Sequence, residues 1–232
     1  SGIKTYCHIE DILADPEIDL LDICLPSPMH CEVAIEALRT GKDVLVEKPI
    51  SLNIEDADRM IREADQLGQI LMVAHVLPFF PEFSYLKNLI SEETYGTLLG
   101  GHFKRIISQP DWSADLGKME LTGGPGVDLH IHDTHYISLL CGIPDCVTVS
   151  GRLVENFYAE YLSTTYHYIN RPDLCITCAC GAISQAGRAF THGFEVYLEK
   201  ATVIYESSTL NGQSLMVTPL TLLTEDGKVW KP

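Results

Sequence analysis

A chain of 232 residues with 46% hydrophobic and 21% charged residues can form one large folded domain or two smaller ones. Its formal net charge of −16 argues against nucleic acid as a partner, because a phosphate-binding surface needs clustered Lys and Arg. No apolar run is long enough to span a bilayer, and the start lacks the apolar core of a signal peptide. We therefore predict a cytoplasmic protein that binds no membrane.

The first third of the sequence alternates short apolar runs with helical patterns. The predicted strands are "IDLLDICLP", "KDVLVEKP" and "QILMVAHV", and the predicted helices are "MHCEVAIEALRTG" and "NIEDADRMIREADQLG". The second helix should begin at the N-cap Asn53. Its predicted buried stripe is Ile54, Ala57, Ile61, Ala64 and Leu67. This alternation predicts βαβ units and a parallel, doubly wound sheet.

A lysine follows the second predicted strand directly. Glu47 and Lys48 come after the apolar residues 44–46, and Pro49 keeps Lys48 extended and ends the strand. Sheets of this type bind ligands beyond the carboxyl ends of their strands. The sequence therefore predicts that Lys48 lies at a ligand-binding edge.

From about Thr97 the sequence is rich in β-type segments without intervening helices. These segments are "TLLGGHFKRII", "CVTVSGRLVE", "YLSTTYHYI", "DLCITCACGAI", "FTHGFEVYLE" and "ATVIYESS". They predict an α+β part with a largely antiparallel sheet, including a hairpin that turns at Glu199 and Lys200. We place the boundary between the two parts near residue 76, giving domains 1–76 and 77–232.

Three cysteines in "CITCAC" have part of a zinc-site spacing. Cys175, Cys178 and Cys180 lie in a β-rich run, and no second Cys/His pair is placed to complete four ligands. We interpret them as strand core and predict no metal.

One helical pattern, "PGVDLHIHDTHYISLLCG", interrupts the β-rich region. On a helix beginning near Gly126, Asp128, His132 and His135 share a face. A carboxylate one turn from an imidazole can orient it and favour proton uptake, which suits a general base. The alternative is that Asp128 caps the helix and His132 is a hydrogen-bonded core histidine.

Three stretches together resemble the glucose-fructose oxidoreductase, inositol dehydrogenase and MocA (Gfo/Idh/MocA) family of nicotinamide-dependent oxidoreductases. They are "ICLPSPMHCEVAIEALRTGKDV", "VLVEKPIS" and "GGPGVDLHIHD". The resemblance implies a Rossmann domain in residues 1–76, incomplete at its N-terminus. It also implies an α+β domain in residues 77–232 with a large, open-faced, mostly antiparallel sheet that covers the substrate and forms homodimers or homotetramers.

The resemblance also implies a reaction and its residues. NAD or NADP would exchange a hydride with a sugar, polyol or cyclitol hydroxyl. The family's catalytic residues match Lys48, Asp128 and His132. Its cofactor-lining positions match Pro26, Ser27, His30 and Glu47, together with Lys48. We add His75, Trp112 and His135 as candidate substrate contacts.

The sequence departs from the family pattern in several places. The phosphate-binding fingerprint G-x-G-x-x-G is missing, and compared with the family the sequence begins near the third strand and ends before the last helix. The family often has Asn-Arg or Arg-Arg where this sequence has His75 and Pro78, and commonly an Asp where it has His135.

Two other functions stay open at this point. A metal-dependent hydrolase could use His130, His132 and His135, provided that the segment were a strand, since residues two apart share a face only there. A non-catalytic dinucleotide- or sugar-sensing protein could use the same scaffold.

Overall fold

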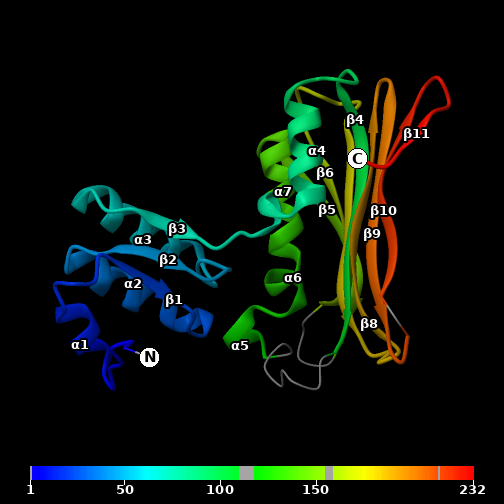
Figure 1. Cartoon of the computed structure of the whole chain (residues 1–232). Helices are drawn as coiled ribbons and strands as arrows, with labels where there is room; N and C mark the ends of the chain where they lie inside the picture. The colour runs from blue at the N-terminus through cyan, green and yellow to red at the C-terminus, as the bar shows by residue number, and fades with distance from the viewer. Residues whose placement is uncertain (1, 110–117, 155–158, 214) are drawn as a thin grey trace. The chain divides into compact units, whose positions relative to one another are not determined.

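The computed structural model of the chain describes residues 2–109, 118–154, 159–213 and 215–232. They form two compact units (Figure 1). The N-terminal unit consists of Ser1–His75 with Glu120–Thr122, and the C-terminal unit of Val76–Met119 and Gly123–Pro232. Within the described ranges, every helix is too short or too polar to cross a bilayer.

The N-terminal unit contains a three-stranded parallel sheet in the order β1-β2-β3. Its elements are α1 (Ile9–Ala14), β1 (Leu20–Ile23), the 3-10 turn η1 (Ser27–Met29), α2 (His30–Arg39), β2 (Asp43–Val46), α3 (Ile54–Leu67) and β3 (Leu71–Val73). The register aligns Ile23, Val46 and Val73, the last residues of the three strands. The predicted succession of parallel strands and helices is confirmed.

Helix α3 begins where the sequence predicts, but it buries only part of the predicted stripe. The Asn53 side chain accepts a hydrogen bond from the Asp56 N–H at 2.8 Å, so it is the N-cap. The buried residues are Met60 and Ala64, whereas most of the predicted stripe is exposed, with Ile54 at 77%. The predicted stripe is confirmed at Ala64 and wrong at the exposed residues Ile54, Ile61 and Leu67, because periodicity marks apolar positions but does not show which of them pack.

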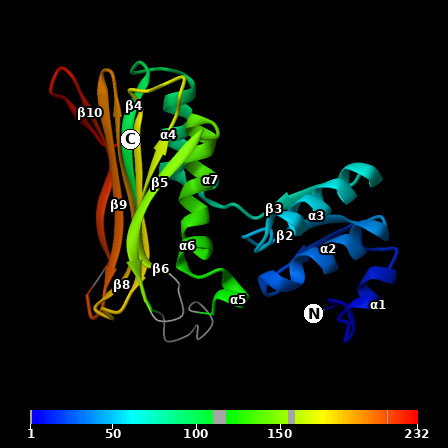
Figure 2. The ribbon, with the colours of Figure 1, turned by 180° about the vertical axis from the view of Figure 1, so that it is seen from behind.

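The C-terminal unit is an eight-stranded sheet with helices on one face (Figures 1 and 2). Its strands are β4 (Leu98–Ser108), β5 (Cys146–Leu153), β6 (Ala159–His167), β7 (Cys175–Ile183), β8 (Arg188–Leu198), β9 (Ala201–Leu210), β10 (Met216–Thr224) and β11 (Val229–Trp230). The order is β11-β10-β9-β8-β4-β7-β6-β5, and every pair is antiparallel except β4 with β7. The predicted antiparallel sheet and the β8–β9 hairpin are confirmed, and "CITCAC" lies in β7.

Five helical elements follow the N-terminal sheet in the described residues, and the sequence analysis identified only the segment that contains the last two of them. They are η2 (Leu77–Phe79), α4 (Pro81–Ser91), α5 (Met119–Thr122), α6 (Pro125–Asp128) and α7 (His130–Cys141). Helices α4, α6 and α7 lie along the same face of the sheet in both views (Figures 1 and 2). The start of α4 had a readable signal, Pro81 in the first turn followed by buried Phe83 and Leu86. Strand β10 was harder to identify because it contains Pro219, beside a register shift in its pairing.

The single helix predicted to begin near Gly126 is two helices. Helix α6 ends at Asp128 and α7 begins at His130, with Leu129 between them. The His132 N–H contacts the Leu129 carbonyl at 3.4 Å, one residue closer in sequence than in a regular α-helix. Asp128 and His132 therefore lie on consecutive helices, and the assumption of one regular helical face is corrected.

A buried ion pair fixes α7 to the sheet. Arg105 on β4 donates to Asp133 through Nε at 2.7 Å and Nη2 at 3.3 Å, and the two residues are 5% and 0% exposed. Further polar contacts of α7 include Thr134 Oγ1 with the Tyr166 hydroxyl at 2.9 Å and the Tyr136 hydroxyl with the Phe83 carbonyl at 2.5 Å. Polar contacts therefore set the position of α7, in addition to apolar packing.

His192 on β8 lies beside this ion pair, among aromatic rings. It is 7% exposed and stacks on Phe83, with ring centroids 6.0 Å apart. Its pKa is lowered to about 4, mainly by burial and also by the positive charge of Arg105, whereas Asp133 acts in the opposite direction. The folded protein therefore holds this ring neutral near pH 7.

We expect the Arg105–Asp133 pair to be costly to break from one side. Asp133→Asn or Arg105→Met leaves a buried charge without its partner and should lower the free energy of unfolding by about 3–5 kcal/mol in denaturant titrations. The double variant Arg105→Met/Asp133→Leu should lose less than either single variant. The exposed pair Arg39–Glu63 is the matched control, where Glu63→Gln should cost at most about 1 kcal/mol. Equal losses at the two pairs would contradict this account.

We also expect acid to destabilise the C-terminal unit partly through His192. An unfolded histidine titrates near pH 6.5, so between about 6.5 and about 4 the unfolded chain binds more protons, and stability falls as the pH falls. The denaturant midpoint should therefore drop less between pH 7 and pH 5 in His192→Phe than in the unaltered protein. His167→Gln, at an exposed position, is the control. An unchanged pH response in His192→Phe would refute this role.

Candidate functional site

Residues predicted to act in chemistry follow the carboxyl ends of the parallel strands. The ladder continues one residue past β2 and β3, with Glu47 N–H donating to the Ile23 carbonyl at 3.0 Å and Ala74 N–H to the Val46 carbonyl at 2.8 Å. Lys48 and His75 come next in the chain, and both are half-buried. The prediction that Lys48 lies at the carboxyl edge of the sheet is confirmed.

The turn after β1 supplies further residues at this edge. Pro26 is exposed and Ser27 is half-buried, and the Met29 N–H closes the turn on the Pro26 carbonyl at 2.9 Å. On the neighbouring strand, the Glu47 carboxylate accepts a hydrogen bond from the Lys48 N–H at 3.1 Å. The edge thus presents a hydroxyl, a carboxylate and an ammonium group.

His30 is placed differently from the other residues of this group. It is the first residue of α2, and its ring is 1% exposed. Nδ1 lies 3.0 Å from the Pro49 carbonyl oxygen and Nε2 lies 2.8 Å from the Leu25 carbonyl oxygen. The ring is buried between the loops that follow β1 and β2.

The second group of predicted residues lies on α6 and α7 of the C-terminal unit. Gly123 and Gly124 precede α6 with φ angles of 72° and 71°, which L side chains rarely adopt. A Cβ on Gly123 would lie 2.7 Å from the Cβ of Val127, so only glycine fits. Asp128 ends α6 and His132 lies in the first turn of α7, both half-buried. The glycine turn therefore sets where this pair of helices begins.

The other two histidines of the segment have different surroundings. His130 is 9% exposed and contacts the Thr164 hydroxyl at 3.1 Å, the Tyr166 hydroxyl at 3.2 Å and the Cys178 thiol at 3.6 Å. Burial lowers the pKa of both His130 and His135. His130 is thus a core residue.

The hydrolase alternative required these histidines to lie on a strand, and the segment is helical. In the described parts of the chain, no group of three or more His, Cys, Asp or Glu side chains is placed to hold a metal ion. Trp112, the remaining candidate, lies outside the described residues.

The sequence analysis missed Arg105 and Asp133, which anchor the helix that carries His132. A signal was present, because Arg105 is in phase with Phe103 on β4 and so belongs to the helix-covered face. A charged residue at such a position needs a buried partner.

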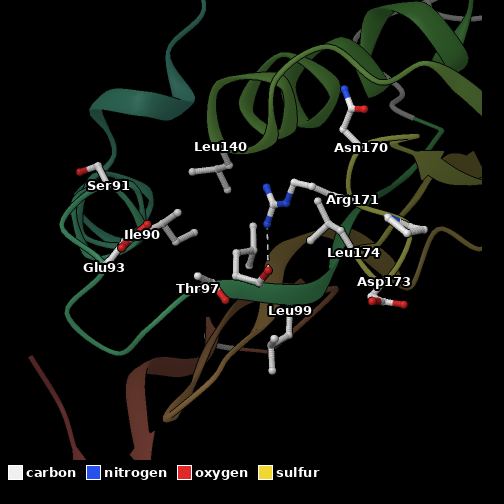
Figure 3. Close-up of a pocket in the computed structure, with 12 residues that line it drawn as sticks. Ile90, Ser91, Glu93, Thr97, Leu99, Leu140, Asn170, Arg171, Asp173 and Leu174 are labelled. Atoms are coloured by element: carbon white, nitrogen blue, oxygen red, sulfur yellow. Dashed lines mark hydrogen bonds between the residues drawn. The ribbon is translucent and has the colours of Figure 1, made fainter.

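A cavity of about 700 Å³ lies in the C-terminal unit among the ends of α4 and α7, the start of β4 and the β6–β7 loop (Figure 3). Arg171 extends into it and donates to the Leu98 carbonyl at 2.9 Å. The lining also includes the acidic residues Glu93 and Asp173, so its charge does not select one class of ligand. None of the predicted site residues lines it.

Comparison with known proteins identifies the N-terminal unit. Residues 1–75 match the model of an oxidoreductase family described as having an NAD-binding Rossmann fold, Gfo/Idh/MocA. The chain is 29% identical to trans-1,2-dihydrobenzene-1,2-diol dehydrogenase of Sus scrofa, over 76% of this chain and 53% of that protein. It is 32% identical to myo-inositol 2-dehydrogenase of Thermotoga maritima, over 56% of this chain and 38% of that protein. The chain thus spans about half the length of such relatives, or less.

Solved structures share the fold of nearly the whole chain. A levoglucosan dehydrogenase in complex with NADH and levoglucosan aligns over 92% of this chain and 64% of its own, with a TM-score of 0.77 and 18% identity. A putative NADPH-dependent oxidoreductase from Desulfitobacterium hafniense covers 98% of this chain and 68% of its own, with a TM-score of 0.82 and 17% identity. The N-terminal unit therefore matches the Gfo/Idh/MocA oxidoreductase family model, and nearly the whole chain shares the fold of these solved structures.

Proposed function

We propose that the intact protein is an NAD(P)-dependent oxidoreductase that transfers a hydride between the nicotinamide and a hydroxyl-bearing carbon of a sugar, polyol or cyclitol. One observation carries the proposal: the family match covers the unit in which Lys48 follows the carboxyl end of β2. In open parallel sheets this edge is where nucleotide ligands bind.

The residues at this edge suit the nicotinamide end of a dinucleotide. Pro26 and Ser27 after β1, with Glu47 and Lys48 after β2, would contact the nicotinamide and its ribose. The sequence contains no G-x-G-x-x-G stretch, so we assign no residue to the pyrophosphate and do not choose between NAD and NADP. Bound nicotinamide supplies the hydride acceptor for oxidation and the donor for reduction.

The chemistry of the chain's own groups is proton transfer and charge stabilisation. During oxidation, a ring nitrogen of His132 takes the hydroxyl proton, and the Lys48 ammonium stabilises the negative charge that develops on the oxygen. The C–H electron pair leaves as hydride and the C–O bond becomes a carbonyl. Asp128 orients His132, while His75 and His135 contact other polar groups of the substrate. Trp112 stays a prediction.

The substrate class rests on the relatives' names. Dihydrobenzenediol, myo-inositol and levoglucosan are rings that carry hydroxyl groups. Ammonium and imidazole groups suit a secondary hydroxyl on such a ring, and the choice among rings depends on contacts beyond these groups. We therefore propose a cyclic polyol or sugar.

We further propose a homodimer or homotetramer formed through the open face of the C-terminal sheet. This face has no helix on it in either view of the described residues (Figure 2), and its exposed side chains include Tyr161 and Tyr197. Sedimentation should give a dimeric or tetrameric mass, reduced by Tyr161→Glu/Tyr197→Glu. A monomeric mass for the unaltered protein would refute the interface. The cytoplasmic location stays a prediction from composition.

Loss of either proposed catalytic group should reduce turnover strongly. Lys48→Ala and His132→Ala should each lower kcat by about 100-fold or more in assays of NAD or NADP reduction with a panel of cyclic polyols and sugars, because each removes a group that acts in the transition state. Lys228→Ala and His8→Ala, at exposed positions, are the controls. Unchanged turnover in either test variant would remove that residue from the mechanism.

A further inference from the structure

His30 has an arrangement that a neutral histidine cannot satisfy. Its two ring nitrogens lie 3.0 Å and 2.8 Å from the carbonyl oxygens of Pro49 and Leu25, and both contacts have the geometry of an N–H donor. A carbonyl oxygen can only accept. A neutral imidazole has one N–H and one lone pair, so one of the two contacts would then set a lone pair against an oxygen.

Deep burial makes this mismatch important. The ring is 1% exposed, so bulk water cannot easily stand in for a missing donor. A doubly protonated ring would satisfy both oxygens with charge-assisted hydrogen bonds. Its position at the start of α2 acts in the opposite direction, since a helix N-terminus disfavours positive charge. Burial also disfavours the charged ring. The two short hydrogen bonds to main-chain oxygens therefore have to outweigh both the helix dipole and the loss of hydration.

The same unit contains a buried cationic side chain that bridges main-chain oxygens. Lys42 is 3% exposed and donates through Nζ to the main-chain oxygens of Asp15 at 2.7 Å and Ile18 at 2.8 Å. These oxygens precede β1, and Lys42 itself directly precedes β2. The strand pair β1–β2 is thus held at its amino end by one cationic side chain that bridges main-chain oxygens.

We propose that His30 is a doubly protonated clamp that holds the loop after β1 to the loop after β2, and so positions Lys48. Pro49, whose oxygen it binds, directly follows Lys48 in the chain. A fixed Pro49 limits where the backbone of Lys48 can lie, and hence the volume that its ammonium group can reach. The clamp itself depends only on contacts within the N-terminal unit, whereas its consequence for turnover rests on the proposed function of Lys48. His30 is therefore a positioning residue, acting through the loops and not by lining the cofactor.

The protonation of the ring can be measured without any activity. In ¹⁵N NMR of the histidine rings of the intact protein at neutral pH, both nitrogens of His30 should carry a proton. The signals are assigned by their loss in His30→Gln, with exposed His8 as the reference ring. A ring with one unprotonated nitrogen would overturn the proposal.

Kinetics then test what the clamp does. His30→Gln has donors on one nitrogen only, so its side chain can bind the main-chain oxygen of one of the two loops at most. The variant should therefore have a kcat about 10- to 100-fold lower, with a smaller change in KM. His8→Gln is the control. His30→Leu removes both donors and should lower kcat at least as much as His30→Gln. If His30→Leu does not fold, His30→Gln and the NMR of the unaltered protein still decide the question. Unchanged kcat in His30→Gln would refute the positioning role, provided that Lys48→Ala is impaired.

The outcomes separate this proposal from the proposed function. Two protonated nitrogens with a fully active Lys48→Ala variant would keep the clamp and reject Lys48 as a catalytic group. One protonated nitrogen with an inactive Lys48→Ala variant would reject the clamp and keep Lys48.

Discussion

The parallel register of β1, β2 and β3 is the constraint that places the candidate site residues of the N-terminal unit. Because Ile23, Val46 and Val73 are aligned, the residues that follow them must emerge at one edge of the sheet. Short strands alone would hold this edge weakly. Buried side chains that bridge main-chain oxygens act at both ends of the β1–β2 pair, Lys42 before the strands and His30 after them.

In the C-terminal unit, a buried ion pair holds the helix that carries a candidate site residue. Helix α7 presents His132 from its first turn, and the adjacent residue Asp133 is bound to Arg105 from the sheet. A buried ion pair is weak evidence for stability, since apolar residues could replace it, but it does define one position of the helix. Neutral, buried His130 and His192 lie in the same interior, where burial disfavours any further charge.

Sequence patterns identified most elements because local signals agreed with the fold. The Asn53 cap, the strand end at Lys48 and the antiparallel segments could all be read from residue types. The buried residues of α3 could be read only in part, since periodicity does not show which apolar side chains pack against the rest of the unit. The break at Leu129 and the partners of His30 and Asp133 were also missed, because they depend on residues distant in sequence.

The central claim is that Lys48 and His132 act on one hydroxyl in one transition state. A double-variant cycle tests it most directly, with kcat/KM measured for the intact protein, Lys48→Ala, His132→Ala and the double variant. Groups that act as a unit give strongly non-additive losses. The account predicts that kcat/KM of the double variant is only slightly lower than that of the less active single variant. Losses that simply multiply would contradict it.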